Sequence, residues 1–296
     1  MNDQKQGFLL ESCDVRGQYI SLDATWQDAC ARVDYPEVVS QVLGEAFVAA
    51  GLLSATIKFD GKLTLQVRGS GNIHLLVVQV TNDGKLRGLA RWHDVPEGTS
   101  LLELFGEEAQ LTIAIEATRG AEPYQGIVAL EGNSLSDAIR RYFETSEQLK
   151  THLQLAVSAT SACGLLLQAL PVEARTADDD DGFTRAVTLA ESFSDEELLS
   201  KNLEPLLRLA YHQEQVRVFD AEPVEFHCSC SRERIDGMLQ GMGRAEVDDI
   251  LNEQEHIEVT CEFCDVTYRY DRVDADALFN ATPGYENSND PGGPTH

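Results

Sequence analysis

Four of the seven cysteines of this chain lie in two tight pairs, and this feature constrains the fold more than any other. One residue separates Cys228 from Cys230, two separate Cys261 from Cys264, and thirty residues lie between the pairs. This spacing is typical of a small zinc-binding module, because each pair supplies two thiolates from a tight turn and the intervening chain folds back to complete a tetrahedron. We therefore expect one Zn²⁺ per chain, held by these four cysteines.

The acidic character of the chain argues against several classes of partner. Fifty acidic and 23 basic residues give a formal net charge of -27, and such a surface repels nucleic acid and anionic lipid. The first residues lack the basic start and apolar run of a signal peptide, and no stretch approaches the roughly 18 apolar residues of a membrane span. We expect a cytoplasmic protein without nucleic-acid or membrane partners, whose cysteines are reduced at rest.

Residues 1–176 have the pattern of an α+β domain. One helix is predicted with Asp34 as its cap and Pro36 in its first turn. Its apolar positions continue to Ala50, so it is expected to end near Gly51 or a few residues later. A second, amphipathic helix is predicted over residues 134–149.

The strands of this domain are predicted from alternating apolar and polar residues and from hairpin turns. Asp60-Gly61 indicates a hairpin, since glycine tolerates the positive φ that a primed turn requires. The predicted strands are residues 15–22, 57–59, 62–67, 75–80, 86–92, 111–117, 124–130, 153–158 and 163–170. Hairpins beside long helices indicate the α+β class.

Residues 177–225 form a linker of different composition. From Asp178 to Glu225 there are thirteen acidic and four basic residues, with leucine and phenylalanine at helical spacing among them. Ser194 is the expected cap of one helix, with Glu197 as its capping-box partner. The predicted helices are residues 183–193, 195–200 and 203–212. Helices this short are marginal by themselves, so the linker is expected to fold only when it packs against something else.

The cysteine pairs define a C-terminal module at residues 226–280. Between the pairs, residues 246–252 have the pattern of a helix, and residues 266–270 have that of a strand. Residues 281–296 are rich in proline, glycine and asparagine without an apolar pattern, so they are expected to form a disordered tail.

Three interpretations of the four cysteines remain open from the residues alone. The first is a purely structural zinc site. The second, a thioredoxin-like site, is disfavoured because it needs a single C-x-x-C in a βαβ context. The third is a redox switch, in which peroxide converts a nucleophilic thiolate to sulfenic acid and the neighbouring thiol closes a disulfide that no longer binds the metal. In that case the module loses its metal cross-link and unfolds, and a linker packed against it is destabilised.

Several stretches of the sequence carry a resemblance to one family. Around the cysteines these are residues 226–234 (FHCSCSRER), residues 261–264 (CEFC) and Tyr268. Further upstream they are residues 34–36, 52–61, 124–132, 142–149, 196–199 and 209–212. Together they resemble the redox-regulated heat-shock chaperones of thirty-three kilodaltons, over nearly the whole chain.

The resemblance implies a holdase chaperone that works without ATP and is not an enzyme. It implies an inactive, reduced, zinc-bound form, and oxidation that links Cys228 to Cys230 and Cys261 to Cys264. Zinc release, unfolding of the linker, binding of unfolding client proteins and a homodimer of the oxidised form are implied as well. A glycine often follows the last cysteine in that family, where a zinc knuckle favours positive φ. Asp265 stands there in this chain, and aspartate tolerates that conformation better than most residues.

For the client-binding surface, we hypothesise that apolar residues of the linker make the contacts. They are Phe183, Leu189, Phe193, Leu198, Leu199 and Leu203.

Two other functions compete with the holdase. One is a zinc-stapled protein-interaction protein without a redox switch, and the other is a thiol oxidoreductase. No Ser-His-Asp order, Walker loop or Rossmann fingerprint supports a conventional active site. The isolated Cys13, Cys30 and Cys163 are expected to be packing thiols. His227 and His256 are not expected to bind the metal, because four cysteines already complete a tetrahedron.

Overall fold

The architecture is that of a computed structural model, which describes residues 3–57, 59–94, 100–117, 123–171 and 181–280. The chain divides into two compact units, Met1–Cys228 and Ser229–His296. Helices and mainly antiparallel sheets occur together, so the predicted α+β class is confirmed.

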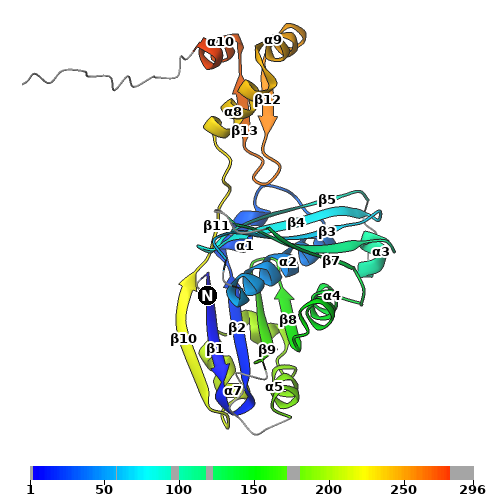
Figure 1. Cartoon of the computed structure of the whole chain (residues 1–296), viewed down its shortest axis with the longest axis vertical. Coiled ribbons are helices and arrows are strands. Elements are labelled where there is room, and N and C mark those ends of the chain that lie inside the picture. The colour runs from blue at the N-terminus through cyan, green and yellow to red at the C-terminus, as the bar shows by residue number, and fades with distance from the viewer. Residues whose placement is uncertain (1–2, 58, 95–99, 118–122, 172–180, 281–296) are drawn as a thin grey trace, which may run out of the picture. The chain divides into compact units, whose positions relative to one another are not determined.

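The first unit is built around one long buried helix, α2 (Glu37–Thr56), in which thirteen residues are buried. A helix that is apolar on nearly every side belongs in a core, and α2 contacts strands of both sheets of this unit (Figure 1). The predicted cap was wrong, since Pro36 occupies the N-cap position and Asp34 does not cap the helix.

The expectation that no stretch approaches a membrane span needs a correction at α2. This helix is long and apolar enough to cross a membrane, the one such helix among the residues that the structure describes. However, 72% of its most apolar window is buried inside the first unit, which is the environment of a core helix.

A five-stranded antiparallel sheet lies on one side of α2, with the strand order β10-β1-β2-β9-β8. Its strands are β1 (Gln4–Leu10), β2 (Val15–Leu22), β8 (Thr151–Val157), β9 (Ala162–Ala169) and β10 (Val216–Pro223). The predictions of β2, β8 and β9 are confirmed. The sequence pattern did not indicate β1, nor β10, which lies within the predicted linker and pairs with β1.

A six-stranded sheet lies on the other side of α2, with the order β11-β5-β4-β3-β6-β7. Its strands are β3 (Gly61–Arg68), β4 (Ile73–Thr81), β5 (Lys85–Trp92), β6 (Gln110–Ala117), β7 (Tyr124–Ala129) and β11 (Glu225–Phe226). The predicted hairpins β4–β5 and β6–β7 are confirmed, although the turn between β6 and β7 at residues 119–120 lies outside the described residues.

The hairpin predicted at Asp60-Gly61 was wrong. Helix α2 runs to Thr56 and β3 begins at Gly61, and the described residues between them are not in a strand. Strand β3 pairs instead with β4 and β6, both antiparallel.

The remaining helices of this part are shorter than predicted or were not predicted. They are η1 (Glu11–Cys13), α1 (Ala24–Cys30), α3 (Leu101–Phe105), α4 (Leu135–Tyr142) and the π-helical turn η2 (Phe143–Glu147). The helix predicted over residues 134–149 corresponds to α4 and η2, and Ser134 caps it. It ends where Gln148 adopts a left-handed conformation.

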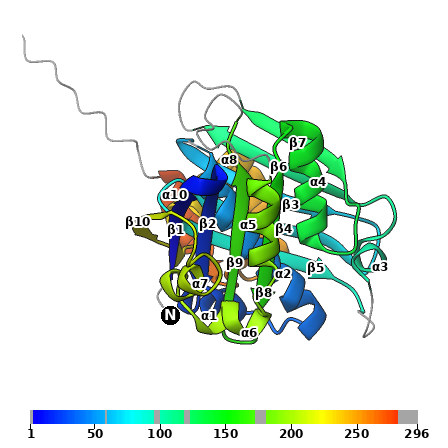
Figure 2. The same cartoon turned by 90° about the horizontal axis from the view of Figure 1, so that it is seen from below.

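Three short helices of the predicted linker pack on the five-stranded sheet: α5 (Gly182–Ala190), α6 (Asp195–Ser200) and α7 (Leu203–Ala210). Figure 2 shows α5 running alongside β9, and α6 contacts β8 and β9. Together with β1, β2 and β9 they enclose a second hydrophobic core. Ser194 and Glu197 form the predicted capping box of α6. The Tyr211 hydroxyl donates a hydrogen bond of 2.7 Å to the Ala186 carbonyl, which ties the end of α7 to α5.

The second unit is small. It contains α8 (Arg232–Met242), α9 (Arg244–Glu253), β12 (Ile257–Thr260), β13 (Thr267–Tyr270) and α10 (Arg272–Asn280). The helix predicted at residues 246–252 lies within α9, and the predicted strand 266–270 corresponds to β13. The helices α8 and α10 and the strand β12 were not predicted. The expected tail, residues 281–296, lies outside the described residues.

Candidate metal centre

The first cysteine pair sits between a strand and a helix. Cys228 comes two residues after β11, and Cys230 comes two residues before α8. The Ser231 hydroxyl caps α8 by accepting the Arg234 amide. The Arg234 guanidinium also donates to the carbonyl and the hydroxyl of Ser229, at 2.8 and 2.7 Å. These local bonds hold the turn between the two cysteines.

The second pair lies in the turn between β12 and β13. The Cys261 amide donates to the Val266 carbonyl at 2.9 Å, and the Asp265 amide donates to the Cys261 carbonyl at 2.8 Å. Asp265 has φ of 56°, so the positive φ expected after the last cysteine is confirmed. Aspartate is one of the few residues besides glycine that adopt this conformation readily.

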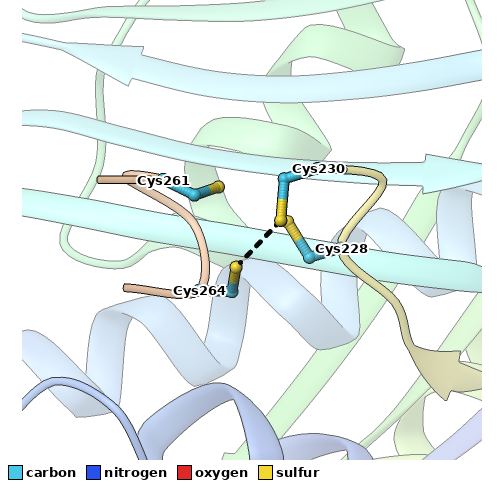
Figure 3. Close-up of side chains that lie close together, drawn as sticks. All are labelled: Cys228, Cys230, Cys261 and Cys264. Atoms are coloured by element: carbon cyan, nitrogen blue, oxygen red, sulfur yellow. Dashed lines mark hydrogen bonds between the residues drawn. The ribbon is translucent and has the colours of Figure 1, made fainter. Parts of the chain in front are cut away.

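The two turns bring the four sulfur atoms together (Figure 3). All four Sγ atoms lie within 4.8 Å of one another, and those of Cys230 and Cys264 are 3.2 Å apart. None of the four cysteines forms a disulfide; Cys264 is buried and the other three are half-buried. Four Zn–S bonds of about 2.3 Å in a tetrahedron would place the sulfurs roughly 3.8 Å apart. The spacing of the four sulfurs therefore fits a tetrahedral Zn²⁺ ion.

Two side chains outside the quartet reach these sulfurs. The Tyr268 hydroxyl donates to Cys230 Sγ at 3.3 Å, and this contact is the main reason that the pKa of Tyr268 is raised to about 12. Arg87, on β5, has its Nη1 atom 4.0 Å from Cys228 Sγ. Tyr268 stands in the motif around the cysteines, whereas Arg87 is 141 residues from Cys228 and no motif points to it.

The other sequence candidates do not join this cluster. Among the described residues, neither His227 nor His256 belongs to the group of side chains that could hold a metal ion, and His256 faces Glu258 at 3.0 Å. Arg232, in the motif around the first cysteine pair, forms a salt bridge with Asp274 at 2.9 Å.

The three isolated cysteines have a different environment. Cys13 and Cys163 are buried and Cys30 is half-buried. Burial raises the pKa of each thiol, to about 11 for Cys30 and about 12 for Cys163. Protonated thiols are poor nucleophiles and poor metal ligands, so these three behave as packing residues.

The six linker residues hypothesised to bind clients are covered in this structure. Phe193, Leu198 and Leu203 are buried in the second core, and the other three are half-buried against it. They are Phe183, Leu189 and Leu199. The hypothesis therefore requires the linker helices to leave the five-stranded sheet.

Comparison with known proteins gives one consistent result. The family described as "Hsp33 protein" matches residues 3–271. The chain belongs to the Hsp33 family. The "33 kDa chaperonin" of Nitrosococcus oceani is 46% identical over 94% of each chain. The proteins of the same name in Chromobacterium violaceum and Pseudomonas aeruginosa strain PAO1 are 41% and 42% identical, each over 94% of this chain and 94% and 95% of their own.

The fold of this Hsp33-family chain also matches a solved structure. The 33 kDa chaperonin of Thermotoga maritima, an Hsp33 homologue, superposes with a TM-score of 0.80 at 18% identity, covering 94% of this chain and 98% of the other. The likeness at this identity concerns the fold. Membership of the family makes the chain a chaperone rather than an enzyme, with a C-terminal four-cysteine cluster able to hold a metal ion.

Proposed function

We propose that this Hsp33-family chain is a redox-regulated holdase that binds unfolding proteins without ATP. The observation that carries the proposal is the convergence of four thiols, each with a partner thiol two or three positions away in the chain. In the resting form these thiols would hold one Zn²⁺, which keeps them deprotonated and cross-links the two turns. We place this form in the cytoplasm, where thiols stay reduced.

Oxidation then acts on the thiols themselves. A thiolate attacks peroxide, giving a sulfenic acid and hydroxide, and the neighbouring thiol displaces the sulfenic oxygen as water and forms a disulfide. For each pair, two thiols and one peroxide become one disulfide and two water molecules. We propose the pairings Cys228–Cys230 and Cys261–Cys264. The Sγ atoms of Cys230 and Cys264 also lie close together. Peptide mapping must therefore exclude a Cys230–Cys264 disulfide as the alternative pairing.

Oxidation then leads to unfolding of the linker, residues 177–225. A disulfide is a poor zinc ligand, so the small module loses the cross-link between its turns. The linker helices are short and lie beside that module in the sequence, and their apolar side chains are covered by the five-stranded sheet. When the helices leave the sheet, the six apolar residues from Phe183 to Leu203 become available to unfolding clients. The acidic residues keep the opened chain in solution, and we expect it to form a homodimer.

The test follows zinc, thiols and chaperone action in one sample. Peroxide with mild heat should release about one zinc per chain, consume four thiols and suppress light scattering by an unfolding client. The Cys261→Ser/Cys264→Ser double variant should lose zinc retention, while Cys30→Ser should behave like the unmodified chain. If zinc and thiols are lost but the client aggregates unchanged, the holdase proposal is wrong.

The client-binding residues need their own experiment. Replacing Leu198, Leu199 and Leu203 together by serine should weaken client binding by the oxidised chain, because the opened linker would then offer less apolar surface. Leu209→Ser is the matched control, since Leu209 is already 51% exposed on the same linker. Equal client binding by the triple variant and the control would contradict this assignment.

A further inference from the structure

The residues before the first cysteine are fixed to the first unit. Strand β11 pairs in parallel with β5, so that Glu225 lies opposite Lys85 and Phe226 opposite Leu86. Beyond the strand, the His227 amide donates to the Leu86 carbonyl at 2.9 Å. The Phe226 side chain packs against the main core. Cys228, the last residue of the first unit, is therefore positioned by the six-stranded sheet.

Arg87 is the residue of β5 that follows this pairing, and its side chain is held in place. Its Nε and Nη2 atoms both donate to Gln79 Oε1 on β4, at 3.0 and 2.8 Å. This forked contact leaves Nη1 to reach Cys228 Sγ at 4.0 Å. A guanidinium presents its donors in a rigid plane, so a fork anchored on Gln79 fixes where the remaining donor points.

A cation at this place has a clear physical effect on the cluster. Four thiolates around one divalent cation carry a net charge of about -2, in a chain whose formal net charge is already -27. A charged N–H donor near one sulfur withdraws electron density from it, so the sulfur attacks an oxidant more slowly. Groups of this kind around a metal site commonly change metal affinity by about 10–100-fold.

We propose that Arg87 is a positioning residue of the redox centre, which holds the Cys228 thiolate in place for the metal and slows its oxidation. This inference rests on the proposed function. It makes the six-stranded sheet of the first unit part of the switch, because the sheet positions both the cysteine, through β11, and the cation beside it, through Gln79.

The test compares two arginine variants of one strand. Arg87→Met removes the donor, whereas Arg91→Met removes the same charge four residues further along β5, roughly 13 Å away and also on the exposed side of the sheet. In the reduced, zinc-loaded full chain, Arg87→Met should give up zinc to a chromophoric chelator at about 10–100-fold lower chelator concentration. Cys228 in this variant should also react faster with peroxide, followed by mass spectrometry of the peptides. Arg91→Met should match the unmodified chain in both measurements.

Two further variants separate positioning from a general loss of structure. Gln79→Ala keeps Arg87 but removes its anchor, and should shift both measurements in the same direction by a smaller factor. Arg87→Lys keeps the charge without the fork, and should fall between Arg87→Met and the unmodified chain. Equal zinc retention and oxidation in Arg87→Met and Arg91→Met would overturn the inference. If the unmodified chain does not bind zinc or respond to peroxide, the proposed function fails instead.

Discussion

The two units of this chain are each stabilised in a different way. The first has two hydrophobic cores, one around α2 between the sheets and one under the linker helices. The second has a single core of six buried residues: Leu239, Val247, Leu251, Ile257, Tyr270 and Ala275. Units this small bury too little apolar surface to be stable without a further cross-link. In the function that we propose, a metal held by the four cysteines supplies that cross-link, so a change in their chemistry acts on the second unit first.

Metal removal should produce the largest difference in amide protection between the two units. Zinc binding by structural cysteine sites amounts to about 10–16 kcal/mol, more than the small core can replace. A strong chelator added to the reduced chain should abolish amide protection in α8 to α10, while α2 stays protected. Hydrogen exchange with mass spectrometry measures both regions at once, and added zinc should restore protection. Unchanged protection of α8 to α10 in metal-free protein would show that this core stands without the cross-link.

A cavity in the first core should produce the reverse pattern. Phe47 on α2 is fully buried, and its ring packs edge-on against Trp26 with the centroids 5.9 Å apart. Phe47→Ala should lower the free energy of unfolding of the first unit by about 3–5 kcal/mol, measured by urea denaturation. Phe219→Ala, at a half-exposed position of β10, is the control and should have little effect. An unchanged free energy of unfolding in Phe47→Ala would show that this ring does not stabilise the first core.

The linker helices occupy an intermediate position in this comparison. Tyr211→Phe removes the hydroxyl that donates to the Ala186 carbonyl, which should cost about 0.5–1.5 kcal/mol. The loss should appear as faster amide exchange in α5 and as client binding at a lower peroxide dose. Leu209→Ala, on an exposed face of α7, should leave both unchanged. Faster amide exchange in α9 rather than α5 would contradict the expectation that Tyr211 stabilises the linker helices.

The smallest effect is expected at the turn after the last cysteine. Asp265 has a positive φ, a conformation that glycine adopts without a steric cost. Asp265→Gly should therefore strengthen zinc retention slightly, by less than about 1 kcal/mol, in a chelator competition. Asp265→Val should weaken it, because a β-branched side chain tolerates positive φ poorly. Tighter retention in the valine variant would show that backbone strain does not limit this turn.

Most elements with a local signal were predictable. The alternation of residues 15–22 matches β2, and the capping box Ser194–Glu197 marks the start of α6. The edge strand β10 has no such signal, because nearly all of its residues are exposed. Its partner β1 lies more than two hundred residues away, with Gln4 opposite Pro223. The hairpin error at Asp60-Gly61 arose because this dipeptide matches a turn pattern, while α2 extends to Thr56 and leaves no first strand for a hairpin among the described residues.

The amino-acid sequence by itself determined the chemistry of this protein: two thiol pairs, a strongly acidic chain and a linker of short amphipathic helices. These properties follow from residue type and short-range spacing, which are visible without a fold. Only the tertiary structure decided that the linker helices complete a core with the five-stranded sheet and that Arg87 reaches Cys228. Both depend on contacts between residues far apart in the chain, which form only when burial of apolar surface brings the strands together.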